Sequence, residues 1–125
     1  MVTYLNNLNY NREVTSNKKR VIILFASSWC IACEEILPKY ERWAEEYADQ
    51  LEFKVIDIAK NKHLVKKFDV ATALTFIIME GKTVITRFAG MQTDETFKYF
   101  ITRAWKKPPQ GGFLILSIIW FRYIL

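Results

Sequence analysis

The segment Trp29-Cys30-Ile31-Ala32-Cys33 decides the fold that this sequence predicts. It follows an apolar run and precedes a stretch of helical periodicity, so both cysteines are expected where a buried strand is followed by a helix. Both sulfurs then lie within one helical turn, where they can form a disulfide and open it again. Unpaired N–H groups and the dipole at the helix start lower the pKa of the first thiol. A thiolate is the nucleophile of thiol–disulfide exchange, so the segment predicts redox chemistry.

The sequence on either side of this segment predicts a strand and a long helix. Residues 21–26 form a near-continuous apolar run with β-branched side chains, which is typical of a strand buried on both faces. Residues 30–49 form the helix, and Pro38 inside it should introduce a kink. Glu34 and Glu35 in its first turn should disfavour a nearby thiolate. The helix carries an apolar stripe formed by Ile36, Tyr40, Trp43, Ala44 and Tyr47.

Shorter elements are expected in the rest of the chain. They are an edge strand at 2–5, a short helix within 6–16, a strand at 51–58, a helix at 60–68, and strands at 75–79 and 83–88. Gly81 lies between the last two strands, as in an antiparallel hairpin. Thr93 is expected to cap a final helix. Alternating strands and helices, followed by a hairpin and a terminal helix, predict an α/β fold with a mixed central sheet and helices on both faces.

The strand, the Trp-Cys-x-x-Cys turn and the helix with Pro38 resemble the thioredoxin family over residues 2–105. The resemblance implies a thioredoxin-like domain at 1–107 that reduces or exchanges protein disulfides, with electrons from a thioredoxin-reductase-type donor. It makes Cys30 the exposed attacking cysteine, Cys33 the buried resolving cysteine, and Trp29 the tryptophan that shields the pair. The residues that it implies for substrate binding are Trp29, Ile31, Ala32, Ala73, Leu74, Thr75 and Gly90.

Three positions close to the cysteines depart from the family pattern. Ile31-Ala32 stands between the cysteines, where thioredoxins have Gly-Pro. Leu24 stands where the family usually has an aspartate that assists proton transfer to the resolving cysteine. Phe53 replaces the lysine that usually partners that aspartate. These departures leave the sulfur chemistry in place and bear on its rate, its potential and the choice of partner.

The fourth departure concerns the cis-proline of the family, which is normally followed by threonine. The matching pair is Leu74-Thr75, with Ala73 as the alternative if the hairpin is shifted by one residue. A non-proline cis bond costs about 2.5–4 kcal/mol, so the Ala73–Leu74 bond should be trans. The loop should then offer a backbone N–H that proline lacks, with the Leu74 side chain beside Trp29 and partly over Cys33. On this interpretation Leu74→Pro changes activity more than stability.

The composition narrows the classes of function. With 51% hydrophobic and 25% charged residues, the 125-residue chain is expected to be one ordered domain rather than a disordered segment. The net charge of +5 is attributed to a solvated basic surface, and no nucleic-acid partner is expected because no nucleic-acid-binding motif accompanies the charge. Residues 1–7 lack the pattern of a secretory signal, so the cytoplasm is the expected compartment.

Two other interpretations stay open. One is a thioredoxin-fold binding module that holds a protein partner around Trp29, Leu74 and Gly90, with little redox turnover. The other is a dimer that shares a metal or iron–sulfur site through Cys30 and Cys33. A structural zinc site needs four ligands, and one chain supplies only two cysteines and a distant histidine, so no cofactor is expected within one chain.

The composition changes after residue 105. Residues 106–112 form a linker that is rich in proline and glycine from 108 on. Residues 113–125, which end the segment 108–125, are almost entirely apolar. A bilayer-spanning helix needs about 20 apolar residues, so this tail is too short to span. It could lie in a membrane interface, dock on the domain or pair with another chain.

Overall fold

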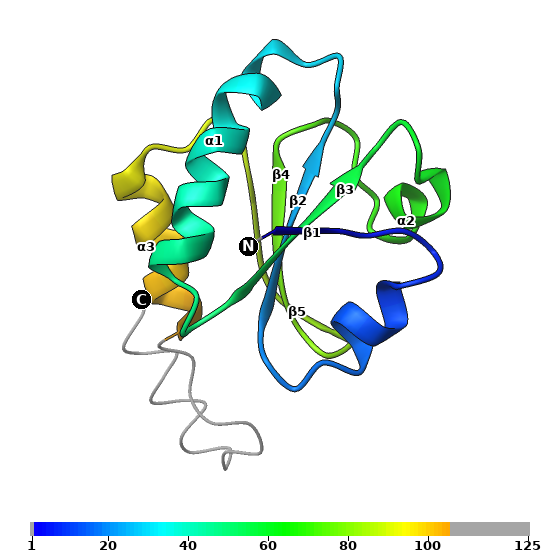
Figure 1. The fold of residues 1–125 in the computed structure, drawn as a ribbon, viewed down its shortest axis with the longest axis horizontal. Coiled ribbons are helices and arrows are strands. Elements are labelled where there is room, and N and C mark those ends of the chain that lie inside the picture. Colours follow the sequence, from blue (N-terminus) through cyan, green and yellow to red (C-terminus); the bar gives the residue numbers. More distant parts are fainter. Residues whose placement is uncertain (1, 106–125) are drawn as a thin grey trace. The chain divides into compact units, whose positions relative to one another are not determined.

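The computed structural model describes residues 2–105 (Figure 1). The elements are β1 (Val2–Tyr4), η1 (Asn11–Thr15), β2 (Val21–Ala26), α1 (Ile31–Glu46), β3 (Glu52–Asp57), α2 (Lys62–Lys67), β4 (Thr75–Glu80), β5 (Thr83–Ala89) and α3 (Asp94–Trp105). Every expected element is present, with its ends within a few residues of the expected ones; the short helix η1 is a π-helix. The apolar tail expected at 108–125 and its linker lie outside the described residues.

The five strands form one mixed sheet in the order β1-β3-β2-β4-β5. Strand β3 pairs in parallel with β1 and β2, whereas β4 is antiparallel to β2 and to β5. The central strand β2 is buried along its whole length, because it has a neighbour on each edge and both of its faces are covered. The structure therefore confirms the α/β fold with a mixed central sheet.

Helix α1 covers one face of this sheet (Figure 1). Its Tyr40 ring packs edge-on against Phe53 of β3, with the ring centroids 5.1 Å apart. The Tyr40 hydroxyl lies 3.0 Å from the carbonyl oxygen of Ile22 and 2.7 Å from that of Lys54, to which it donates. These contacts attach the middle of α1 to β2 and β3, and so they fix the start of the helix relative to the end of β2.

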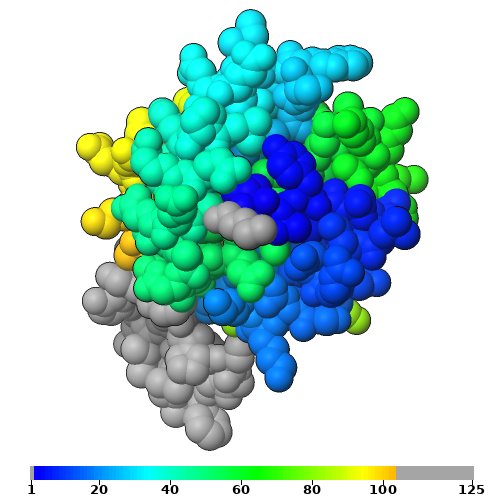
Figure 2. Space-filling model, in the orientation of Figure 1, coloured from blue at the N-terminus to red at the C-terminus, as the bar shows by residue number. Residues whose placement is uncertain are grey.

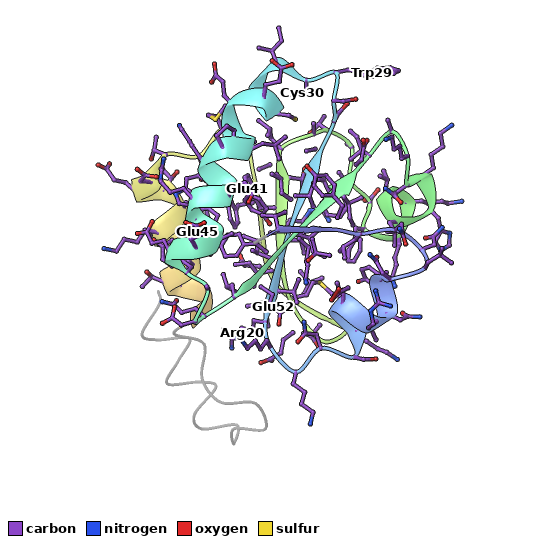
Figure 3. The ribbon with its side chains drawn as sticks, in the orientation of Figure 1. Arg20, Trp29, Cys30, Glu41, Glu45 and Glu52 are labelled. Atoms are coloured by element: carbon purple, nitrogen blue, oxygen red, sulfur yellow. The ribbon has the colours of Figure 1, made fainter. Side chains whose placement is uncertain are left out.

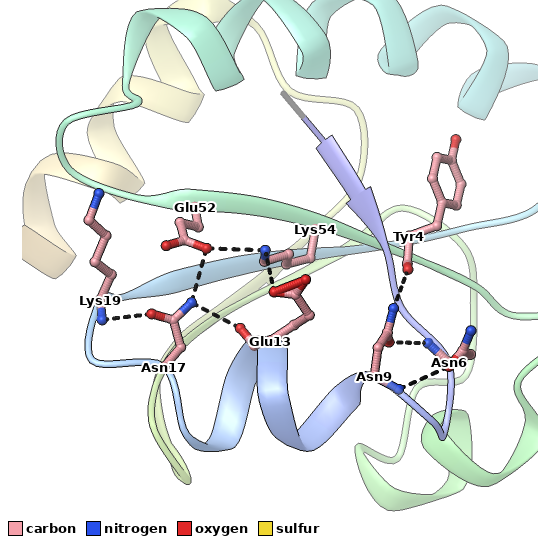
Figure 4. A network of polar contacts seen from close by, with 8 residues as sticks. All are labelled: Tyr4, Asn6, Asn9, Glu13, Asn17, Lys19, Glu52 and Lys54. Atoms are coloured by element: carbon pink, nitrogen blue, oxygen red, sulfur yellow. Dashed lines mark hydrogen bonds and ion pairs between the residues drawn. The ribbon is translucent and has the colours of Figure 1, made fainter.

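The opposite face of the sheet is covered by η1 and α2 (Figure 1). Their apolar side chains join those of β2, β3 and β4 in one cluster that includes Tyr10, Val14, Phe25, Ile56, Leu64, Phe68 and Ile77. Lys54 points to the same face and is buried, and its ammonium lies 3.1 Å from Glu52 and 3.5 Å from Glu13 (Figure 4). This ion-paired lysine links η1 to β3.

Helix α3 belongs to a second compact unit that begins at Thr93. Thr93 Oγ1 accepts a hydrogen bond from the Thr96 N–H at 3.1 Å, and Thr96 Oγ1 accepts one from the Thr93 N–H at 2.9 Å. This reciprocal arrangement satisfies two N–H groups at the helix start and confirms Thr93 as the cap. Among residues 2–105, no helix has the length and apolar character needed to cross a membrane.

Candidate redox site

Cys30 and Cys33 lie where β2 gives way to α1. The start of α1, in cyan, is at the surface at one end of the unit formed by residues 2–92 (Figure 2), and Figure 3 labels Cys30 there. Cys30 has an extended backbone and is the N-cap of α1, because its sulfur accepts a hydrogen bond from the Cys33 N–H at 3.3 Å. The local sequence therefore uses a thiol in the capping position that serine, threonine or aspartate usually occupies. Both cysteines are free, so the structure shows the dithiol.

Cys30 has the properties of the attacking thiol. Its pKa is lowered, first by the hydrogen bond from the side chain of Cys33 and then by the backbone N–H groups of Cys33 and Ala32, although desolvation opposes the shift. Glu34 and Glu35, which the sequence predicts to disfavour a nearby thiolate, are exposed to solvent and are not among the groups that shift the pKa of Cys30. A partly exposed thiol with a lowered pKa is the form of cysteine that attacks disulfides.

Cys33 has the opposite properties. Only 1% of it is exposed, and its sulfur accepts a hydrogen bond from the Ser27 N–H at 3.4 Å. Burial, followed by the hydrogen bond to Cys30 and by the charges of Cys30 and Asp57, raises the pKa of Cys33 to about 11. The pair is therefore asymmetric: an accessible sulfur that favours the thiolate contacts a buried sulfur that stays protonated.

The structure corrects the expected role of Trp29. We expected this side chain to shield the cysteines, with Leu74 beside it, but 87% of Trp29 is exposed and it points away from Cys30 (Figure 3). Residue 29 lies in the turn between β2 and α1, where the Trp29 N–H donates to Ser27 Oγ at 3.2 Å. Ile31, in the first turn of α1, is also 79% exposed, whereas Ala32 is half-buried. An apolar surface therefore lies next to Cys30 and leaves the cysteine uncovered.

The loop before β4 contains Leu74, the second group of expected site residues. The described residues contain no cis peptide bond, which confirms a trans bond between Ala73 and Leu74. Leu74 has a φ of +60°, a left-handed conformation that is unfavourable for a branched side chain. Its N–H donates to the Phe25 carbonyl oxygen, and its carbonyl oxygen accepts from the Gly90 N–H, both at 2.8 Å. The expected free N–H is therefore not offered to a partner, because β2 already accepts it.

The remaining expected residues surround Leu74. Thr75 is buried, and its hydroxyl donates to the Thr72 carbonyl oxygen at 3.0 Å. Ala73 is half-buried, and Gly90, with a φ of +96°, is exposed. The site residues thus form two groups, one at the start of α1 and one at the loop before β4, and the end of β2 connects them.

Two residues that contact or influence Cys33 were missed from sequence. Ser27 acts through its backbone N–H, which no residue pattern identifies. Asp57 could have been found, since it ends the strand that pairs in parallel with β2. Across residues 2–105, no group of three or more histidine, cysteine, aspartate or glutamate side chains could hold a metal ion.

Comparison with known proteins finds one family and relatives that carry the same family name. The family described as Thioredoxin matches residues 1–103. Thioredoxin-2 of Saccharomyces cerevisiae is 32% identical over 91 residues, which span 72% of this chain and 86% of that protein. Thioredoxin-T of Drosophila melanogaster is 28% identical over 85 residues, spanning 68% of this chain and 54% of that protein. The bifunctional thioredoxin reductase/thioredoxin of Mycobacterium leprae is 30% identical over 78 residues, spanning 62% of this chain and 17% of that protein.

Proposed function

This chain belongs to the thioredoxin family of thiol–disulfide oxidoreductases, and we propose that it reduces the disulfides of other proteins through Cys30 and Cys33. The observation that carries the proposal is the asymmetry of the pair. Cys30 is accessible and has a lowered pKa, whereas Cys33 is buried beside it and has a raised pKa. Such a pair provides one sulfur for attack and a second one for release of the target.

The reaction uses two exchanges. The Cys30 thiolate attacks one sulfur of the target disulfide, and the other target sulfur leaves as a thiolate. Cys33 then loses its proton and attacks the sulfur of Cys30, which breaks the bond between Cys30 and the target. Two electrons pass to the target, and the chain is left with a Cys30–Cys33 disulfide.

The residues around the pair are proposed to hold the target chain. Trp29 and Ile31 present exposed apolar surface next to Cys30, so they suit apolar side chains that flank the target cysteine. The loop at 73–75 and Gly90 are proposed as the other border of the binding surface. The backbone of Leu74 is bonded within the domain at both its N–H and its carbonyl, so this residue contributes shape rather than backbone pairing.

The same proposal includes the electron donor, the cellular compartment and the residues that carry the activity. A thioredoxin-reductase-type donor would return the Cys30–Cys33 disulfide to the dithiol, and the name of the Mycobacterium leprae relative joins a reductase with a thioredoxin. We place the activity in the cytoplasm, and we assign it to residues 1–107 without the apolar tail.

One observation favours a second candidate function, a binding module with little redox turnover. Leu74 is buried in a left-handed conformation in place of the proline of the family, and Leu24 replaces the aspartate. A slow second exchange would then leave the chain bound to its partner instead of releasing it.

Insulin reduction separates these two candidates. With dithiothreitol as electron source, the wild-type chain should reduce insulin faster than dithiothreitol alone, and both Cys30→Ser and Cys33→Ser should fall to the background rate. A wild-type chain that binds insulin but leaves the rate at background would contradict the reductase and support the binding module.

A further inference from the structure

The second exchange requires a proton acceptor for Cys33. Burial is the largest cause that raises the pKa of Cys33, and it remains when Cys30 is bonded to the target, so Cys33 enters the second exchange as a protonated thiol. At the central position of β2, Leu24 is fully buried and has no group that could accept a proton. A different residue near Cys33 must therefore take the proton if the second exchange is to be fast at neutral pH.

The sheet places Asp57 next to this sulfur. Strands β2 and β3 are parallel, and their register pairs Ala26 with Asp57. The following residue, Ser27, donates its N–H to Cys33 Sγ at 3.4 Å, so both Cys33 and Asp57 lie beside the end of β2. The Ile58 N–H donates to the Ala26 carbonyl oxygen at 2.9 Å, which continues the pairing beyond Asp57.

Side-chain alternation directs Asp57 toward the cysteines. Residues 53, 55 and 57 of β3 share a face, and Phe53 packs against Tyr40 of α1. Asp57 is thus on the face that α1 covers, level with the start of that helix. The paired residue Ala26 carries only a methyl group on the same face of the sheet.

The charges around Cys33 single out the same carboxylate. Cys30, the N-cap of α1, and Asp57 from β3 are the groups whose charges act on Cys33. Glu34 and Glu35 on α1 and Lys60 beyond β3 are exposed to solvent. Asp57 is half-buried, and its Oδ1 accepts a hydrogen bond from the Ala59 N–H at 2.9 Å, which holds the carboxylate in place.

We propose that Asp57 accepts the proton of Cys33, through one water molecule, as Cys33 attacks the disulfide between Cys30 and the target. The S–H bond of Cys33 breaks, Asp57 becomes the neutral acid, and the new Cys30–Cys33 bond forms as the target sulfur leaves with its electron pair. The departing thiolate or solvent then takes the proton from Asp57. This role rests on the proposed reductase function, and it assigns the proton step to β3 instead of the centre of β2.

The reaction with 5,5′-dithiobis(2-nitrobenzoate) separates the two exchanges. Attack by Cys30 releases one yellow thionitrobenzoate, and resolution by Cys33 releases the second, so stopped-flow absorbance gives a rate for each step. Asp57→Asn should slow the second release at least tenfold at pH 7, and its rate should then rise in proportion to hydroxide. The first release should change less than twofold. Glu34→Gln, which neutralises an exposed carboxylate next to Cys33 in sequence, is the matched control and should leave both releases unchanged.

Other results of this experiment would contradict either the role of Asp57 or the reductase function. A faster second release in Asp57→Asn would show that the carboxylate only disfavours the Cys33 thiolate, and the proposal would be wrong. An equal slowing at every pH would indicate a displaced site and would also overturn it. Failure of the first release at Cys30 would count against the reductase function itself. The wild-type chain gives a test that needs no variant: the rate of its second release should change little with pH around pH 7, and a rate proportional to hydroxide throughout would refute the role of Asp57.

Discussion

Substitution of Leu74 gives a sharp test of the loop beside the cysteines. Leu74 is 7% exposed and has a φ of +60°, and its N–H donates to Phe25 at 2.8 Å. Leu74→Ala should destabilise the domain by about 2–5 kcal/mol, because it removes a buried side chain and keeps the unfavourable backbone. Leu74→Gly removes one carbon more but suits the left-handed conformation, so it should be about 1 kcal/mol more stable than Leu74→Ala.

Leu74→Pro should be the least stable of the three. Proline holds φ near about −65°, far from the observed +60°, so the loop cannot keep its backbone. Proline also lacks the N–H that Phe25 accepts, and an unpaired buried carbonyl costs about 1–3 kcal/mol. The structure therefore reverses the sequence-based prediction that this change would affect activity more than stability.

Urea unfolding followed by circular dichroism at one pH gives the four stabilities. We expect the free energy of unfolding to be highest for the wild type and then to fall from the glycine variant to the alanine variant to the proline variant. An alanine variant as stable as the glycine variant would show that the backbone at 74 is not left-handed. A proline variant as stable as the wild type would refute both the trans loop and its hydrogen bond to β2.

Three further substitutions test other parts of the fold. Tyr40→Phe removes a buried hydroxyl that donates to the Lys54 carbonyl oxygen, and urea unfolding should show a loss of about 1–3 kcal/mol; an unchanged midpoint would contradict this bond. Asp69 has a φ of +52° after α2, so Asp69→Gly should raise the free energy of unfolding by about 0.5–1 kcal/mol, and a lower value would contradict that backbone. Burial alone would raise the pKa of Glu52, but hydrogen bonds from Lys54 and Asn17 outweigh it, so the pKa is lowered. Its stabilisation is therefore present above about pH 4.5, the usual pKa, and is lost as the pH falls through the lower folded value; Lys54→Met should flatten this part of the pH–stability curve, and an unchanged curve would contradict the pairing.

The sequence predicts most of the fold because its signals are local. The apolar run at 21–26 corresponds to β2 without a shift, since a strand buried on both faces needs no polar alternation. The Thr93 cap and the Gly81 turn were also predicted, because each depends on the chemistry of one or two residues.

The details of the site depend on contacts between distant segments, and the sequence did not predict them. Trp29 is exposed instead of shielding the cysteines, and the left-handed backbone of Leu74 is held by hydrogen bonds with Phe25 and Gly90. Asp57 was missed because its place near Cys33 follows from the register of two parallel strands, although its position at the end of a predicted strand could have indicated it.

The most direct test of the reductase is to trap its covalent intermediate with insulin. Cys33→Ser keeps the attacking thiol and removes the resolving one, so it should accumulate a disulfide-linked complex on a non-reducing gel, and peptide mapping should place the linkage at Cys30. Cys30→Ser should form no such complex under the same conditions, because its remaining thiol is buried and burial raises the pKa of Cys33. A complex linked through Cys33, or equal trapping by both variants, would contradict the assignment of Cys30 as nucleophile and Cys33 as resolving thiol.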